Sequence, residues 1–418
     1  MRLNVLENRM TVSLPEEKEF YASIGLHAFL LASWLIAPFA GLFFIFACLY
    51  YVNLSRREFI WYVFLAASYP ALINITKQPV SDLLVYSGVY VSHSDVPFLQ
   101  FFQYFNTDYL FHFIDLVLGK ISGANVAVFV AFWSIFTYFL VMWTQVKCYE
   151  WLPQTENGKR DLVLLLGYTL FAGLLFGLSA HLMREYPAGA LLMLALSCWA
   201  FDKKYHIPLY IGAVLIHFSL LLLLPIYPLW RYFGAKSLRA IPVIMLVAFV
   251  AGSANVFDAI IAVMGKSSSI GFFADILSKA SAYVSKDDGQ ASLLAWMRLA
   301  LFGLFAVYLL YKHGKKSEPL QKFVFAMLYL LTALILFRNT SLLLLRYFYY
   351  TDFFNMILLV FAICYENRNP FLRIALIGVA LISPFKFVHD IHNLYMVYID
   401  NSYYIAGYSV FDFLQAIH

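Results

Sequence analysis

Ionisable residues lie in a few short stretches of an otherwise apolar sequence. Asp82 and Tyr86 are four residues apart, so on a helix they share one face. His217 stands between Ile216 and Phe218 in a long apolar run. An imidazole in such surroundings can accept a proton from a hydroxyl. A carboxylate can act as general base, bind a metal or hold sugar hydroxyls, although a solvated loop would carry the same acid. We predict His217 and Asp82 as catalytic residues.

Several arginines lie at the ends of apolar runs. Arg184 and Arg346 follow long apolar stretches and stand next to aromatic residues. The planar fork of a guanidinium suits a phosphate or diphosphate at the lipid headgroup level, and contact with ordinary phospholipids is the alternative. Arg298 lies about one turn inside an apolar run and needs a partner. Arg338 follows in the predicted topology, so we expect it to add positive charge to a cationic outer cavity.

The composition indicates that these residues lie in a polytopic membrane protein. The chain has 418 residues, of which 62% are hydrophobic and 13% charged, and its mean hydropathy is +0.75. This is about half the charged fraction of a soluble domain, so the chain has too little polar surface to cover a soluble globule. The net charge of +5 is typical of basic cytoplasmic loops and indicates no nucleic-acid partner.

The apolar runs predict an all-α fold, because in lipid every backbone polar group must be paired within the segment. We expect one membrane domain over 1–418 with about 11–13 transmembrane segments. Lys and Arg in short loops then place 76–123 outside as a first large loop. A second outer loop, 264–292, carries an amphipathic helix by its spacing. An aromatic outer tail covers 387–418. Residues 22–52 are predicted as an interfacial helix plus a span, or as two short spans.

The charged loops predict a break within residues 207–230. Topologies traced from the N-terminal and the C-terminal basic loops disagree by one crossing. They agree if this run is two short segments folded as a re-entrant hairpin with His217 and Ser219 at its apex; a single span with one misassigned loop is the alternative. Because broken backbone at membrane depth must line a protein-buried or wet cavity, the hairpin is also a predicted site.

Four motifs, taken together, resemble the EpsG branch of the Wzy-type polysaccharide polymerases, which include O-antigen polymerases. The resemblance spans roughly residues 80–400. The motifs are Asp82-x-x-x-Tyr86, Met183-Arg184-Glu185-Tyr186-Pro187, Ile216-His217-Phe218-Ser219 and Arg346-Tyr347-Phe348-Tyr349-Tyr350.

This resemblance implies a glycosyltransferase with a GT-C-like fold in the bacterial inner membrane. Such a polymerase transfers a growing glycan from undecaprenyl diphosphate to the terminal sugar of another lipid-linked repeat on the periplasmic face. It uses no cofactor and no metal ion, although the acidic first loop leaves a metal-assisted version open. Its partners are undecaprenyl-diphosphate-linked oligosaccharides, membrane lipids and a possible chain-length regulator. The product class, whether O-antigen, capsule or exopolysaccharide, stays open.

The site residues then take distinct roles. Arg184 and Arg346 bind the diphosphates, with Arg298 and Arg338 in second rank, and His217 accepts the proton. Asp82 and Tyr86 position the acceptor sugar. The remaining substrate-binding residues are Ser219 and Tyr347.

Two other classes of membrane protein would share some of these features. A flippase or other transporter of lipid-linked oligosaccharides would have a cationic cavity, with internal repeats and broken helices in both halves. The sequence shows one predicted break and no repeat. A membrane O-acyltransferase would also use an intramembrane His, but its donor enters from the cytoplasm, whereas the polar residues here are predicted outside.

Overall fold

The computed structural model describes residues 17–77, 81–105, 107–154, 157–174, 176–179, 181–253, 293–339, 341–366, 369–393 and 407–415. Every regular element in these ranges is a helix, which confirms the predicted all-α fold. The predicted outer loop 264–292 lies outside the described residues.

In the part of the chain that the structure describes, five helices are long and apolar enough to cross a membrane. They are α7 (Val126–Trp151), α13 (Lys236–Ser253), α17 (Glu318–Leu336), and most of α18 (Ser341–Tyr365) and α19 (Pro370–Asn393). Shorter apolar helices accompany them, so the chain is a polytopic membrane protein. Because α19 continues to Asn393, residues 387–393 of the predicted tail are helical.

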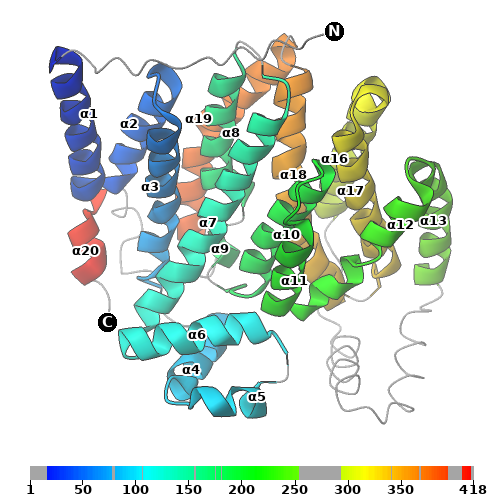
Figure 1. Cartoon of the computed structure of the whole chain (residues 1–418), viewed down its shortest axis with the longest axis horizontal. Coiled ribbons are helices and arrows are strands. Elements are labelled where there is room, and N and C mark those ends of the chain that lie inside the picture. Colours follow the sequence, from blue (N-terminus) through cyan, green and yellow to red (C-terminus); the bar gives the residue numbers. More distant parts are fainter. Residues whose placement is uncertain are drawn as a thin grey trace, which may run out of the picture.

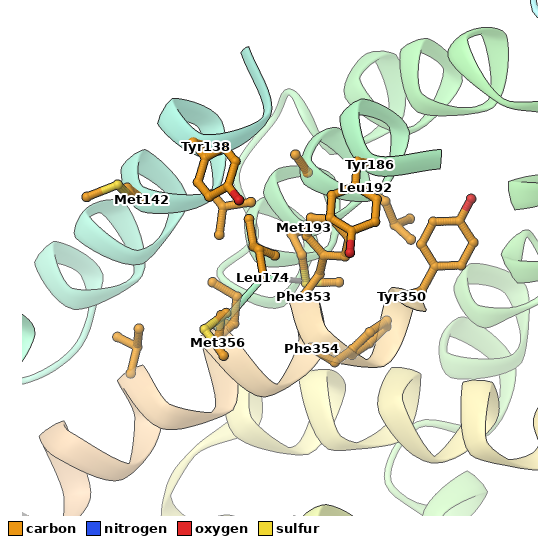
Figure 2. Close-up of a cluster of buried hydrophobic side chains, with 14 of the residues drawn as sticks. Tyr138, Met142, Leu174, Tyr186, Leu192, Met193, Tyr350, Phe353, Phe354 and Met356 are labelled. Atoms are coloured by element: carbon orange, nitrogen blue, oxygen red, sulfur yellow. The ribbon is translucent and has the colours of Figure 1, made fainter. Parts of the chain in front are cut away.

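Helix α18 forms the centre of the bundle, since 89% of its most apolar stretch is buried. Figure 2 shows its side chains packed against residues of α7 and of α10 (Glu185–Ala200). The labelled residues of this buried cluster are Tyr138, Met142, Leu174, Tyr186, Leu192, Met193, Tyr350, Phe353, Phe354 and Met356. A Cβ at Gly189 would meet the Phe353 ring at 2.7 Å, so α10 approaches α18 closely because glycine stands there.

Ion pairs connect helix ends and short loops that carry Lys and Arg, and we call the face formed by these ends the basic face. The pairs are Arg56–Glu150 (2.7 Å), Arg373–Asp161 (3.7 Å), Lys322–Asp202 (2.7 Å) and Lys312–Glu366 (2.7 Å). They join the ends of α3 (Arg56–Asn74), α7, α8 (Gly158–Tyr168), α10, α16 (Leu293–His313), α17, α18 and α19.

The opposite face, here called the site face, carries a layer of short helices. They are α4 (Ser81–His93), η1 (Phe98–Gln100), α5 (Phe101–Tyr104) and α6 (Tyr109–Ser122). Figure 1 shows α4, α5 and α6 lying across the end of the bundle, away from the face where α8 begins. The short α9 (Phe176–Ser179) leads from the bundle interior toward this layer. Most of the predicted first outer loop is therefore helical.

Residues 22–52 form a hairpin of two short helices, α1 (Glu17–Ile36) and α2 (Pro38–Tyr51). The break falls at Ala37, before Pro38, which begins α2. A Cβ at Gly41 would lie 2.7 Å from the Trp34 backbone, so glycine lets the two helices meet. Both sequence-based alternatives for this run, an interfacial helix plus a span or two short spans, require two helices, and the structure has two. The C-terminal α20 (Val410–Gln415) packs beside α1 and α3.

The assignment of the two faces to the two sides of the membrane can be tested by cysteine labelling. All four native cysteines are buried, so the background is low. Leu99 on the site face is 97% exposed, and Lys315 on the basic face is also exposed. We expect Leu99→Cys to react with an impermeant maleimide in intact spheroplasts, and Lys315→Cys to react only after permeabilisation. The reverse pattern would invert the predicted topology.

Candidate functional site

The run 207–230 is broken at His217, as the sequence predicts. Helix α11 (His206–Ile216) ends there, and His217 is extended, with φ −147° and ψ 109°. A 3₁₀ turn, η3 (Phe218–Leu223), leads into α12 (Ile226–Phe233). The Tyr227 ring stacks on His206 with centroids 5.8 Å apart, which brings the returning segment back beside the start of α11. The predicted hairpin is therefore present, and its apex lies at the site face.

At the apex, side chains from neighbouring elements bind backbone groups of the 3₁₀ turn. The Phe218 N–H donates to Asp108 Oδ1 (2.8 Å), and hydroxyls donate to three carbonyls: Tyr347 to Ser219 (2.6 Å), Tyr210 to Leu220 (2.6 Å) and Tyr329 to Leu222 (3.3 Å). At membrane depth each unpaired group would cost several kcal/mol, by the order-of-magnitude rule for lipid. These side chains fix the shape of the apex.

Asp108 joins three elements at the centre of the site. It precedes α6, is 4% exposed, and takes the left-handed conformation (φ 56°, ψ 39°), which Asp adopts more readily than most residues. Its Oδ2 accepts a hydrogen bond from Arg184 Nη1 at 2.5 Å. Its Oδ1 accepts from the Phe218 amide and lies 3.7 Å from His217 Nδ1. One carboxylate thus connects the outer layer, Arg184 and the hairpin.

These contacts determine the protonation state of Asp108. Burial alone would raise the pKa of its carboxyl group. The interactions with His217, Arg184 and the Phe218 amide together outweigh burial and lower this pKa below its usual value. Asp108 is therefore a carboxylate across the physiological pH range.

Arg184 stands immediately before α10 and is clamped from two sides. Its Nε donates to the Tyr86 hydroxyl (3.2 Å), and its guanidinium lies 4.9 Å from the centroid of the Tyr86 ring. Burial would lower the pKa of Arg184, but Tyr86, Asp108 and Glu185 raise it overall, so the guanidinium stays charged. Its side chain is 20% exposed, against 4% for Asp108 and 7% for His217. An anion would therefore meet Arg184 first.

His217 lies between two carboxylates. Its Nε2 is 3.6 Å from Oε1 of Glu185, the fully buried first residue of α10, and its Nδ1 faces Asp108. Each ring nitrogen of His217 thus faces a carboxyl group, and an imidazole is a side chain that can take up a proton during a reaction. We call Asp108, Arg184, Glu185 and His217, with Tyr86, the charged cluster. A guanidinium for an anion and an imidazole for a proton thus lie within one site.

The structure brings some of the predicted residues together and separates others. Arg184, Tyr86 and His217 meet in the charged cluster, with Ser219 and Tyr347 at the hairpin apex beside it; Ser219 Oγ lies 3.4 Å from the Tyr350 hydroxyl. Asp82 lies one turn before Tyr86 on α4, as the spacing predicts. The side chain of Arg346 lies outside the described residues, although its backbone belongs to α18.

The expected cationic cavity is wrong, because carboxylates pair with two of the arginines. Arg184 is bound to Asp108. Arg298 is bound to Asp352, which is buried on α18. Arg338 lies elsewhere, over the Phe249 ring of α13. The sequence analysis missed Asp108 and Glu185 as site residues. A signal for Glu185 existed, since an acid next to Arg184 at the start of an apolar helix needs a partner.

Two grooves in the described part of the chain lie apart from the charged cluster, and none of its members lines them. Within the described ranges no three His, Cys, Asp or Glu side chains are grouped so that they could hold a metal ion. Metal independence stays a prediction.

Fold and site define a polytopic, all-α membrane protein with an ion-paired site at one face. The sequence model of the EpsG family matches residues 59–404, and the chain belongs to this family. Membership confirms the EpsG resemblance and indicates a polysaccharide polymerase-type function. No curated protein and no solved structure matches the chain. The GT-C-like fold stays a prediction.

Replacing Asp108 tests whether the charged cluster holds the site together. We expect Asp108→Asn to lower the stability by about 2–4 kcal/mol, because it leaves a largely buried guanidinium without its ionic partner. Because the pKa of Asp108 is lowered by folding, its stabilisation is complete above the ordinary carboxyl pKa and declines as the pH falls through the lowered value. The gap between wild type and variant should therefore narrow below about pH 4.

The measurement is the midpoint temperature of the purified protein in detergent between pH 3 and pH 7. Asp95→Asn is the matched control, since Asp95 is exposed in the same outer layer. Equal midpoints for Asp108→Asn and Asp95→Asn would show that the cluster does not stabilise the fold.

Proposed function

We propose that this EpsG family member polymerises lipid-linked oligosaccharide repeat units on the periplasmic face of the bacterial inner membrane. It transfers a growing glycan from undecaprenyl diphosphate to the terminal sugar of another lipid-linked repeat. The observation that carries this proposal is the charged cluster, in which a partly exposed guanidinium and a buried imidazole meet at a broken helix.

The reaction breaks the bond between the anomeric carbon of the donor and its diphosphate oxygen. The acceptor hydroxyl oxygen forms the new bond to that carbon, and its proton passes to His217. Undecaprenyl diphosphate leaves as an anion, and Arg184 stabilises the charge that develops on it. Asp108 acts as a positioning residue because it holds both Arg184 and the backbone next to His217.

The other predicted residues have supporting roles in this proposal. Asp82 and Tyr86 on α4 orient the acceptor sugar, and Ser219 and Tyr347 shape the hairpin apex that receives it. Arg346 binds the second diphosphate. Arg298 and Arg338 remain secondary cationic groups. A chain-length regulator would contact the polymer outside this site.

The transporter alternative expects broken helices in both halves of the chain. The described residues contain further breaks at Leu174, where the helical run from Gly158 ends, and at Ala37. The residues around Ala37, Ser33, Trp34 and Pro38, carry no charge, and this break lies before the region that matches the EpsG family. The break at Ala37 thus builds no site comparable to that at His217.

Polymer laddering in cells tests the proposal. In a deletion strain complemented at matched membrane abundance, we expect His217→Ala and Arg184→Ala to leave single-repeat glycan and lower polymer by about 100-fold or more, as loss of a general base or a charge stabiliser does. Arg184→Lys should restore part of the polymer, because Lys keeps the charge but cannot bind Asp108 and Tyr86 together in the same geometry.

His389→Ala is the matched control, since His389 lies on α19 with 70% of its side chain exposed and takes no part in the charged cluster. It should give a normal ladder. Normal ladders for both His217→Ala and Arg184→Ala would remove the site assignment. Loss of even the single capped repeat in the deletion strain would indicate a flippase instead.

A further inference from the structure

A second site lies at the edge of the bundle, where α13, α16 and α17 enclose a groove of about 430 Å³. Figure 1 shows these three helices side by side at one edge of the molecule. Every residue that lines the groove is apolar. The lining side of α16 includes Trp296, Ala300, Gly303, Leu304 and Val307.

The groove runs along the direction of the bundle. Its lining on α16 extends from Trp296 to Val307, which is about 16 Å along the helix axis and about half of the hydrocarbon thickness of a bilayer. It begins at the end of α16 nearest the site face. Small residues make the space: a Cβ at Gly303 would already meet Leu331 at 3.2 Å. The groove therefore has the direction, depth and apolar wall that a lipid chain requires.

A positive charge stands at the site-face end of this groove. Leu331 and Ile335 line it from α17, and Arg338 stands in the turn just beyond the end of that helix. The Arg338 guanidinium lies 3.9 Å from the centroid of the Phe249 ring and donates to the Ser253 hydroxyl. These contacts fix the group at the ends of α13 and α17.

The pairing of the Arg338 charge differs from that of Arg184 and Arg298. Arg184 and Arg298 are each neutralised by a carboxylate, whereas among the described residues Arg338 pairs with no carboxylate. A phosphate-bearing headgroup above an apolar chain is the ligand that complements such a groove, since the chain buries apolar surface and the headgroup supplies the missing negative charge.

We propose that this groove binds the polyprenyl chain of a lipid-linked substrate, with Arg338 contacting its diphosphate. The inference rests on the proposed function, because polymerisation requires two membrane-bound lipid diphosphates. The charged cluster provides for one headgroup, and Arg338 adds a second cation to Arg346 for the other. The groove lies on the lipid-exposed edge of the bundle, so a lipid enters it sideways from the bilayer. Helix α17 separates it from α10, which begins the charged cluster.

The test measures binding of undecaprenyl diphosphate to the full-length protein in nanodiscs of zwitterionic phospholipid. Ala300→Phe fills the groove and should weaken binding at least tenfold. Leu301→Phe is the matched control, because Leu301 is the next residue on α16, is 66% exposed and does not line the groove. Its binding should equal that of wild type.

Arg338→Gln provides a second variant that leaves the groove itself unfilled. It should weaken binding of undecaprenyl diphosphate toward that of the neutral alcohol undecaprenol, and binding of undecaprenol should change little. Wild-type affinity for undecaprenyl diphosphate in both Ala300→Phe and Arg338→Gln would overturn the proposal. Equal competition by the anionic phospholipid phosphatidylglycerol would also overturn it, and would assign the groove to ordinary membrane lipid.

This result is separate from that of the laddering assay. If the deletion strain loses its ladder while Ala300→Phe binds as wild type, the groove assignment fails and the polymerase stands. If the deletion strain keeps its ladder while Ala300→Phe abolishes binding, the groove stands and the polymerase fails.

Discussion

A helix that breaks inside a membrane must have its exposed backbone groups paired, and this requirement organises the site. At the hairpin apex the Phe218 amide is paired by Asp108, and the Ser219 carbonyl is paired by Tyr347. The same Asp108 carboxylate binds Arg184. The groups that satisfy the backbone are therefore the groups that place a guanidinium and an imidazole beside each other. A change at the apex would alter the site and the fold together.

Burial makes the pairing within the charged cluster obligatory. Asp108 is 4% exposed and Glu185 is fully buried, so each carboxylate needs a cation or donors nearby. Arg184 and the hairpin supply them for Asp108. In return, Asp108 and Tyr86 hold the guanidinium in one orientation while a fifth of its side chain stays exposed. The ion pair thus orders Arg184 before any ligand arrives, which lowers the entropic cost of binding an anion.

Sequence alone predicted the features that depend on local pattern and on loop charge. Apolar length predicts the helical membrane fold. The Lys and Arg loops predict the break at His217 as one of two ways to reconcile an odd crossing, the other being a single span with one misassigned loop, and the structure has the break. The one-turn separation of Asp82 and Tyr86 on a single helix is also a local feature, so the sequence predicts it. Asp108 could not be chosen in this way, since its contacts lie 76 and 110 residues away and depend on a left-handed backbone in the outer layer. The pairing of Arg298 with Asp352 is equally non-local.

The charges of the cluster explain why His217, rather than a nearby acid, suits the role of proton acceptor. With both carboxylates ionised and the imidazole neutral, Asp108, Glu185 and Arg184 together carry one net negative charge. A proton taken up by His217 cancels that charge, and in a low-dielectric site this neutralisation is worth more than in water. Asp108 also keeps its bond to the Phe218 amide if Arg184 turns toward a diphosphate. The new imidazolium, 3.7 Å away, then replaces the guanidinium as its ionic partner. In the reaction that we propose, proton uptake by His217 and release of Arg184 toward the leaving group would therefore favour each other.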